Sequence, residues 1–294
     1  MKRTKLIIIN CLALSLVLLI SCKKEIRNYA LSSDGVRISF SVNGKGNPPL
    51  VFVHGFMCSE CIWRDQVSYF SQKYEVVTID LAGFGASGNN REKWGMVAFG
   101  KDVAAVVNKL HLRNVILIGH SMGAPVIIEA AKIIPDRISG LVIVDFLQNI
   151  ETKYPEELIG KKYRSNMDFQ FSSAPFIKKI KFAFKNNPEE VGKKLISMCD
   201  TIRPDTLGWH ESYYDCFRWL NEDCTKSLEA IQTPIISINS DQNPTNIEAF
   251  REYHPEFEVK IIQDVYHFVF LEAPEKFNLF LEESINEFKK ASKK

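Results

Sequence analysis

The chain has 294 residues, of which 46% are hydrophobic and 24% charged, a composition typical of globular proteins. It is too long for a small module and suits one large domain, or one domain with an insertion. The formal net charge is +2, and the first 21 residues contain three basic side chains and no acidic one. This near balance excludes a strongly basic protein, and we expect no nucleic-acid partner.

The N-terminus has the pattern of an export signal. Basic residues 2–5 precede an apolar run over 6–20 that is short for a transmembrane helix. The run ends in Leu-Ile-Ser-Cys22, which resembles the bacterial lipoprotein signal. We therefore predict that signal peptide 1–21 is removed and that lipidated Cys22 anchors the mature protein to a membrane, on the periplasmic or cell-envelope side. The alternatives are plain cleavage or an uncleaved anchor.

Apart from Cys22, five cysteines follow the signal peptide, so they form at most two disulfides and leave one odd thiol. They are Cys58, Cys61, Cys199, Cys216 and Cys224. The first two have the spacing of a redox motif, but the surrounding pattern is not thioredoxin-like and no second such pair is present for zinc. We expect a local disulfide or buried thiols and no metal site, and the sequence leaves the pairing open.

Strands and helices alternate in the first half of the chain. After a tether at 22–35, alternating polarity over 36–43 predicts a half-exposed strand. Short apolar runs predict buried strands at 50–53, 75–80, 114–118 and 138–145. Helical periodicity separates them at 62–73, 94–110 and 124–132. This alternation predicts a parallel sheet with helices on both faces.

The pattern changes over residues 147–230, where no apolar strand run occurs and the segments favour helices. We interpret this stretch as a helical cap inserted into a core formed by 36–146 and 231–294. Within the cap, residues 175–185 are amphipathic, which suits a helix over the active site or a lysine-rich membrane contact. The core then resumes with strands at 233–239 and 258–262 and a final helix at 274–290.

A single pentapeptide carries the chemistry. Gly119-His-Ser121-Met-Gly123 has the form G-x-S-x-G and lies between a predicted strand and a predicted helix. Side chains at the two glycine positions would collide with neighbouring elements. Ser121 would then sit at a strained turn with its hydroxyl exposed at the positive end of a helix. This context predicts a nucleophile, and the alternative is an ordinary turn serine.

Four motifs, in their order along the chain, extend this interpretation. They are His54-Gly55-Phe56, Asp80-x-x-Gly83-x-Gly85-x-Ser87, the pentapeptide around Ser121, and His267 near the end. Together they resemble the α/β-hydrolase fold family, in its capped, esterase-like branch, over residues 36–290. The resemblance implies an eight-stranded, mostly parallel sheet with a cap inserted before the last two strands. It also implies a serine–acid–histidine triad in that chain order.

The base must take the proton of Ser121, because a serine hydroxyl is a weak nucleophile alone. His267 follows the last strand in a loop, where the sheet edge would deliver it beside the serine. For the acid, Asp241 follows the strand at 235–239 and is the first choice. The family's usual glycine and later aspartate are replaced there by Ser240 and Asn243. Asp145, at the end of the preceding strand, is therefore kept as the alternative.

The resemblance also implies an oxyanion hole made of the backbone N–H groups of Phe56 and Met122. His54 and Asp80 are interpreted as structural residues of their loops. We expect a serine hydrolase that cleaves a small ester or related acyl compound through an acyl-enzyme, with no cofactor. Lactonase, thioesterase, carbon–carbon hydrolase and perhydrolase chemistry remain open, and the alternative class is a ligand-binding or signalling module with little turnover.

Overall fold

The computed structural model describes residues 28–155, 188–198 and 206–291. Several sequence-based predictions lie outside these ranges: the signal 1–21, lipidation of Cys22, the amphipathic segment 175–185, and Cys199. None of the described helices is long and apolar enough to cross a membrane.

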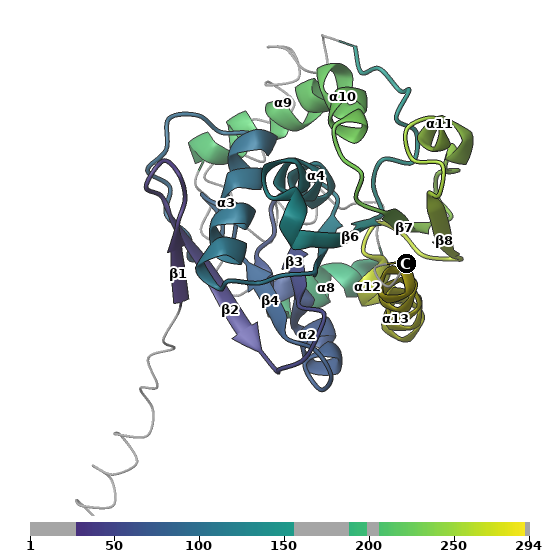
Figure 1. Cartoon of the computed structure of the whole chain (residues 1–294), viewed down its shortest axis with the longest axis horizontal. Helices are drawn as coiled ribbons and strands as arrows, with labels where there is room; N and C mark the ends of the chain where they lie inside the picture. Colours follow the sequence, from purple (N-terminus) through teal and green to yellow (C-terminus); the bar gives the residue numbers. More distant parts are fainter. Residues whose placement is uncertain (1–27, 156–187, 199–205, 292–294) are drawn as a thin grey trace, which may run out of the picture.

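Eight strands form one sheet in the order β1-β2-β4-β3-β5-β6-β7-β8 (Figure 1). The strands are β1 (Asn28–Leu31), β2 (Arg37–Asn43), β3 (Leu50–Val53), β4 (Val76–Ile79), β5 (Val115–His120), β6 (Ile138–Val144), β7 (Ile235–Ser240) and β8 (Glu258–Ile262). The pairs β1–β2 and β2–β4 are antiparallel and the other neighbours are parallel. The predicted eight-stranded, mostly parallel sheet is confirmed. One detail differs, because β1 lies within the stretch predicted to be a tether.

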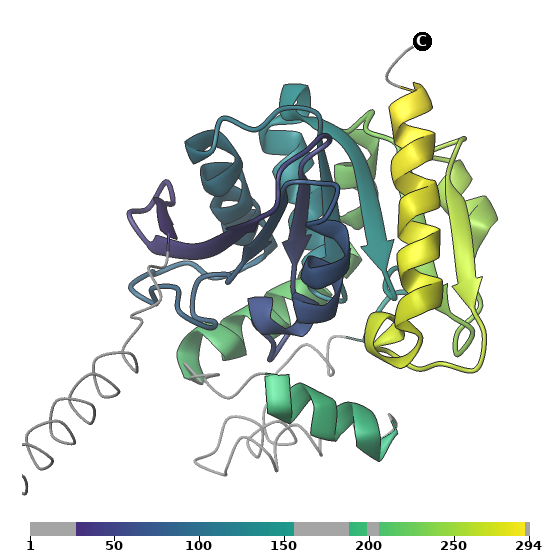
Figure 2. The same cartoon turned by 90° about the horizontal axis from the view of Figure 1, so that it is seen from below.

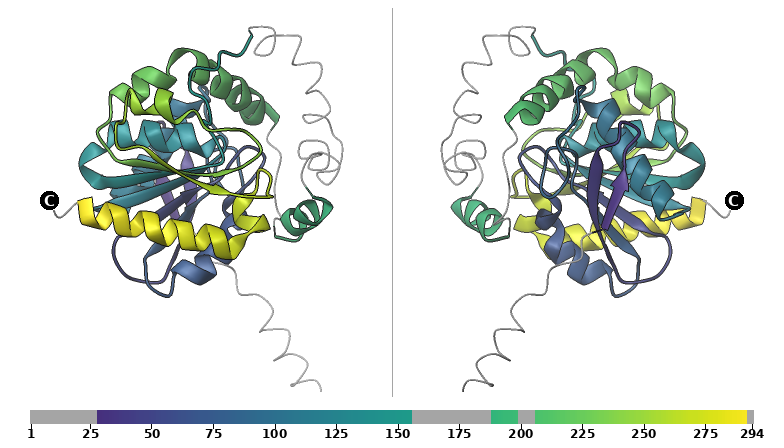
Figure 3. Two further views of the ribbon diagram at one scale, coloured as in Figure 1. Left: turned by 90° about the vertical axis from the view of Figure 1, so that its right-hand side faces the viewer. Right: turned by 90° about the vertical axis from the view of Figure 1, so that its left-hand side faces the viewer.

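Helices cover both faces of the sheet, as Figure 3 shows. One face carries α3 (Met96–Lys109) and α4 (Gly123–Ile133), and the other carries α2 (Arg64–Phe70) and α13 (Pro274–Ala291). Successive side chains of a strand point to opposite faces, so each central strand supplies both cores. In β3, for example, Val51 and Val53 pack in one core and Leu50 and Phe52 in the other.

Short helices complete the core. They are η1 (Glu60–Trp63), η2 (Pro135–Arg137), α11 (Ile247–Arg251) and α12 (Val269–Glu272). The helix predicted at 62–73 is therefore a 3₁₀ turn that continues into α2. Between β6 and β7, the described residues form α8 (Glu189–Met198), α9 (Thr206–Glu222) and α10 (Cys224–Glu229), with no strand among them. Figure 2 shows α8 and α9 on the side of the sheet to which the strand arrows point.

Helix α9 is attached to the core near its N-terminal end. The Trp209 indole N–H donates to the carbonyl of Gly83 at 3.1 Å, and its ring stacks on Phe84 with centroids 5.4 Å apart. Further along α9, Asp215 accepts the backbone N–H of Met96, the first residue of α3, at 2.7 Å. This bond satisfies one of the unpaired donors at a helix start and complements the helix dipole.

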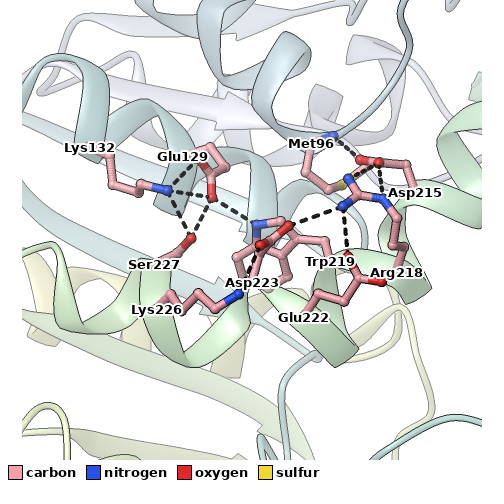
Figure 4. A network of polar contacts seen from close by, with 10 residues as sticks. All are labelled: Met96, Glu129, Lys132, Asp215, Arg218, Trp219, Glu222, Asp223, Lys226 and Ser227. Carbon is pink, nitrogen blue, oxygen red and sulfur yellow. Dashed lines mark hydrogen bonds and ion pairs between the residues drawn. The ribbon is translucent and has the colours of Figure 1, made fainter.

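A second attachment joins α9 and α10 to α4 (Figure 4). The buried carboxylate of Glu129 accepts hydrogen bonds from the Trp219 indole at 2.8 Å and the Ser227 hydroxyl at 2.6 Å. Lys132 forms an ion pair with it at 2.9 Å. A buried charge is tolerable only when it is bonded in this way. Because α4 begins at the pentapeptide turn, these bonds connect the inserted helices to the element that carries Ser121.

The cysteines differ in part from expectation. Cys58, Cys216 and Cys224 are free, buried thiols, and burial raises the pKa of Cys58 to about 12. Cys61 is disulfide-bonded. Of the two expectations, buried thiols are confirmed for these three residues, and a local pair between Cys58 and Cys61 is wrong because Cys58 is a free thiol.

Candidate active site

The turn between β5 and α4 holds Ser121 in a strained conformation, with φ of 51°. Its N–H donates to the carbonyl of Val144 at 3.0 Å. The flanking glycines are required for space, since a Cβ on Gly123 would lie 2.6 Å from the carbonyl oxygen of Val53 and one on Gly119 would collide with Gly123. Strain of this kind persists only where the surrounding structure enforces it, and it is concentrated at functional sites.

His267 is bonded to an aspartate that ends a neighbouring strand. Its Nδ1 lies 2.7 Å from Oδ2 of Asp145, the residue directly after β6. The other carboxylate oxygen of Asp145 accepts the backbone N–H of Ser240, the last residue of β7, at 2.8 Å, and a longer bond from Gln148 at 3.3 Å. Asp145 itself adopts a left-handed conformation, with φ of 46°, which turns its side chain toward the end of β7.

The environment of Asp145 keeps its carboxylate charged. Burial by itself raises its pKa, because the residue is only 5% exposed. The hydrogen bond and charge of His267, with the N–H of Ser240, outweigh burial and hold the pKa of Asp145 below its usual value. A carboxylate charged at neutral pH can accept the imidazole N–H and stabilise an imidazolium.

Asp241, the first choice for the acid, is placed elsewhere. It is exposed, and its carboxylate accepts the backbone N–H of Asp264 at 3.1 Å, a bond that lowers its pKa. Strand β7 continues through Ser240, so the chain leaves the sheet only after the position that bonds Asp145. The structure thus places Asp145, the alternative acid, against His267. Asp241 instead accepts a hydrogen bond from the loop that precedes the histidine.

The loop after β3 lies directly against the pentapeptide turn. A Cβ on Gly55 would be 3.0 Å from the Cβ of Ser121 and 2.9 Å from Nδ1 of His120, so a glycine is needed for this approach. Phe56 follows Gly55 as Met122 follows Ser121, which puts the two predicted oxyanion-hole residues on adjoining segments. Their function there stays a prediction.

His54 fixes the shape of this loop. Its Nε2 lies 3.1 Å from the backbone N of Leu81, which can only donate, so Nε2 accepts and Nδ1 carries the proton. Nδ1 then donates to the carbonyl of Gly55 at 2.7 Å. Burial lowers the pKa of His54 to about 4, so the ring is neutral. These bonds fit the structural interpretation of His54.

Aromatic side chains of α9 pack against Phe56, one of the predicted oxyanion-hole residues. The ring of Phe56 packs against Trp209 and Tyr213, with centroids 5.9 Å and 5.2 Å apart. Tyr213 also packs against Phe217 at 4.9 Å. The inserted helix therefore forms an aromatic wall beside the predicted oxyanion hole.

Two polar residues near His267 were not identified from the sequence. Glu272 carries no motif signal, and His120 is a variable position of the G-x-S-x-G pattern. Both contact the backbone of residues 266–268. Among the described residues, no group of three or more histidines, cysteines or acids is arranged to hold a metal ion.

Residues 48–183 match the family described as "alpha/beta hydrolase fold". The chain is 30% identical over 118 residues to 2-(acetamidomethylene)succinate hydrolase of Mesorhizobium japonicum, covering 40% of this chain and 42% of that protein. It is 26% identical over 178 residues to Epoxide hydrolase 4 of Mus musculus, covering 56% and 49%. The chain thus spans about half or less of the length of these two relatives. A non-heme haloperoxidase of Rhodococcus erythropolis is 25% identical over 234 residues, covering 73% and 81%.

Solved structures match over a larger share of the chain. An esterase from Thermogutta terrifontis superimposes with a TM-score of 0.73 at 22% identity, covering 89% of this chain and 98% of that one. An esterase from Exiguobacterium antarcticum gives 0.69 at 19% identity, covering 88% and 99%. At these identities the likeness shows the fold. The chain therefore has the alpha/beta hydrolase fold.

Proposed function

We propose that this alpha/beta hydrolase-fold protein is a serine hydrolase with Ser121 as nucleophile, His267 as base and Asp145 as acid. The observation that carries the proposal is the 2.7 Å bond between His267 and Asp145, at the sheet edge where Ser121 occupies its strained turn. These are the three parts that a serine nucleophile needs: an exposed hydroxyl, a base, and a charged group that orients the base.

In this mechanism, Oγ of Ser121 attacks the carbonyl carbon of the substrate while Nε2 of His267 accepts its proton. The negative charge that develops on the carbonyl oxygen is stabilised by the N–H groups of Phe56 and Met122. The intermediate collapses, His267 returns the proton to the departing alcohol, and an acyl group remains on Ser121. A water molecule, deprotonated by His267, then attacks this ester, and the acid is released as Ser121 recovers its proton.

The substrate that fits the proposal is a small ester or a related acyl compound. The rings of Trp209 and Tyr213 pack against Phe56, one of the predicted oxyanion-hole residues, and we expect their bulk to favour a compact substrate. The relatives named epoxide hydrolase suggest a different reaction. A serine at position 121 argues against it, because epoxide hydrolases of this fold use an aspartate nucleophile.

The test is hydrolysis of p-nitrophenyl esters of increasing chain length by the full chain in detergent, beside Ser121→Ala. We expect saturable turnover that the Ser121→Ala variant loses by about 10³-fold or more. Equal rates for the two proteins on every ester would overturn the proposal and favour the ligand-binding alternative.

We further propose that the protein is an exported lipoprotein anchored through Cys22, on the strength of the Leu-Ile-Ser-Cys sequence after the apolar run. Membrane-fraction protein should then carry a lipid mass on its N-terminal peptide and lack residues 1–21. A Cys22→Ser variant should lose the lipid mass. An unmodified Cys22 in membrane-bound protein would contradict this proposal.

A further inference from the structure

The backbone on both sides of His267 is bonded by one carboxylate. Glu272 ends the short helix α12, and its Oε2 accepts the N–H of Tyr266 at 2.9 Å. Its Oε1 accepts the N–H of Phe268 at 3.1 Å. The two oxygens therefore straddle His267 and fix the peptide groups immediately before and after it.

The carbonyl of His267 is bonded from the opposite direction, by the pentapeptide turn. Nε2 of His120 lies 3.0 Å from this oxygen, which can only accept, so Nε2 carries the proton. The ring of His120 is 1% exposed and packs against Phe268 and Phe270, with centroids 5.1 Å from each. Burial and the charge of His267 lower the pKa of His120 well below its usual value, so it acts as a neutral donor.

Both side chains are held at energetic disadvantage. Nδ1 of His120 is buried, and none of the described residues gives it a hydrogen-bond partner, which is unfavourable for a buried polar atom. Burial raises the pKa of Glu272, and the nearby charge of Asp145 raises it further, against the two N–H bonds that lower it. An apolar residue at 120 or an uncharged one at 272 would avoid these penalties. Their presence therefore indicates a task other than stability alone.

The task concerns the position of His267, which the bond to Asp145 does not determine fully. Asp145 bonds His267 at Nδ1 alone. A single hydrogen bond to one ring nitrogen does not fix the position of the backbone that carries the ring. A shift of about 1 Å in a reacting group can reduce the rate about 10²-fold. We propose that Glu272 and His120 are positioning residues that clamp the peptide groups of residues 266–268 and thereby hold Nε2 of His267 at the distance that Ser121 requires. This inference rests on the proposed function, because it needs His267 to be the base.

The experiment compares Glu272→Gln with Glu275→Gln in the full chain. Glu275 is an exposed carboxylate in the first turn of α13, so the control removes the same charge three residues away. Glutamine at 272 retains one acceptor oxygen and points an NH₂ group at the other backbone donor. The second variant, His120→Phe, keeps an aromatic ring but lacks the N–H donor, and it also removes the unpartnered Nδ1.

Rates are divided by the number of reactive serines, counted by titration to completion with a fluorophosphonate that forms a phosphonyl ester on Ser121 and expels fluoride. We expect kcat per reactive serine to fall about tenfold to a hundredfold in Glu272→Gln and in His120→Phe, with KM within about twofold. The rate of phosphonylation should fall in parallel. Glu275→Gln should match wild type, and the Tm of His120→Phe should stay near that of wild type.

Two results would overturn the clamp. One is an unchanged kcat per reactive serine in both variants. The other is a fall in Tm and in the number of reactive serines while the rate of each remaining serine is normal, which would show a purely structural role. Failure of the proposed function looks different, since wild type itself would then show neither ester turnover nor phosphonylation above Ser121→Ala, and no base would exist to be positioned.

Discussion

Asp80 and Asp145 occupy equivalent places in the fold and are used differently. Each follows a buried strand of the sheet, β4 and β6 respectively, and each is nearly inaccessible. The carboxylate oxygens of Asp80 accept the backbone N–H groups of Glu60 and Ala86, both at 2.8 Å. Those of Asp145 are divided between a backbone N–H at Ser240 and the imidazole of His267. The end of a strand therefore supplies a buried carboxylate, and its partners decide whether it shapes loops or orients a base.

The largest expected effect is the loss of activity on substitution of Asp145, the aspartate that bonds the base. Asp145→Asn keeps the shape of the side chain but removes the charge that holds the imidazole in its tautomer. We expect kcat on p-nitrophenyl esters to fall by about 10⁴-fold, as for other triads that lose the acid. Steady-state kinetics measure this, with circular dichroism to verify folding. A loss smaller than about tenfold would remove Asp145 from the triad.

Asp80→Asn should show the opposite pattern. The asparagine oxygen can accept one of the two N–H groups, but its NH₂ group meets the other, leaving a buried donor unsatisfied. We expect the free energy of unfolding to fall by about 1–3 kcal/mol, as measured in urea. Activity per reactive serine should change less than about tenfold, far less than in Asp145→Asn. If the Asp80→Asn protein kept normal stability but lost as much activity as Asp145→Asn, the distinction between a structural Asp80 and a catalytic Asp145 would be wrong.

Sequence patterns were sufficient for the architecture because strands and helices alternate with clear apolar periods. Ser121 could be identified locally, because G-x-S-x-G between a strand and a helix is itself a short pattern, although the space at Gly123 is limited by Val53 of a distant strand. The acid could not. Whether Asp145 or Asp241 reaches His267 depends on where β7 ends and on the left-handed turn at Asp145, and neither is encoded in a local pattern.

The clamp residues were missed for a related reason. His120 lies in a recognised motif, yet its bond is to a carbonyl 147 positions later in the chain. Glu272 is close to His267 in sequence but bonds backbone groups, and such bonds leave no requirement on the identity of the residues that donate them. Strand β1 was missed because its four residues have no apolar alternation and pair with β2 at the antiparallel edge of the sheet.

A smaller effect concerns pH and again separates the two aspartates. The pKa of Asp145 in the folded protein is below its ordinary value, so its bond to His267 contributes stability above the unfolded pKa of about 3.9 and loses it as pH falls through and below that value. Asp145→Asn removes this contribution. We expect the difference in unfolding free energy between wild type and Asp145→Asn to narrow from pH 6 to pH 3, as measured by urea titration. A difference independent of pH would show that the pKa of Asp145 is not depressed.

The smallest expected effect is that of Asp241→Asn, which completes the comparison with an exposed aspartate at the end of a third strand. Its carboxylate lies in solvent and accepts one backbone N–H, from Asp264, and the asparagine oxygen can accept the same bond. We expect kcat and KM within about twofold of wild type and a stability change below about 0.5 kcal/mol, as for ordinary surface substitutions. Measured beside Asp145→Asn under the same conditions, a loss of kcat approaching 10⁴-fold at position 241 would mean that the acid changes partner during turnover, and the pairing of His267 with Asp145 would then describe the resting enzyme only.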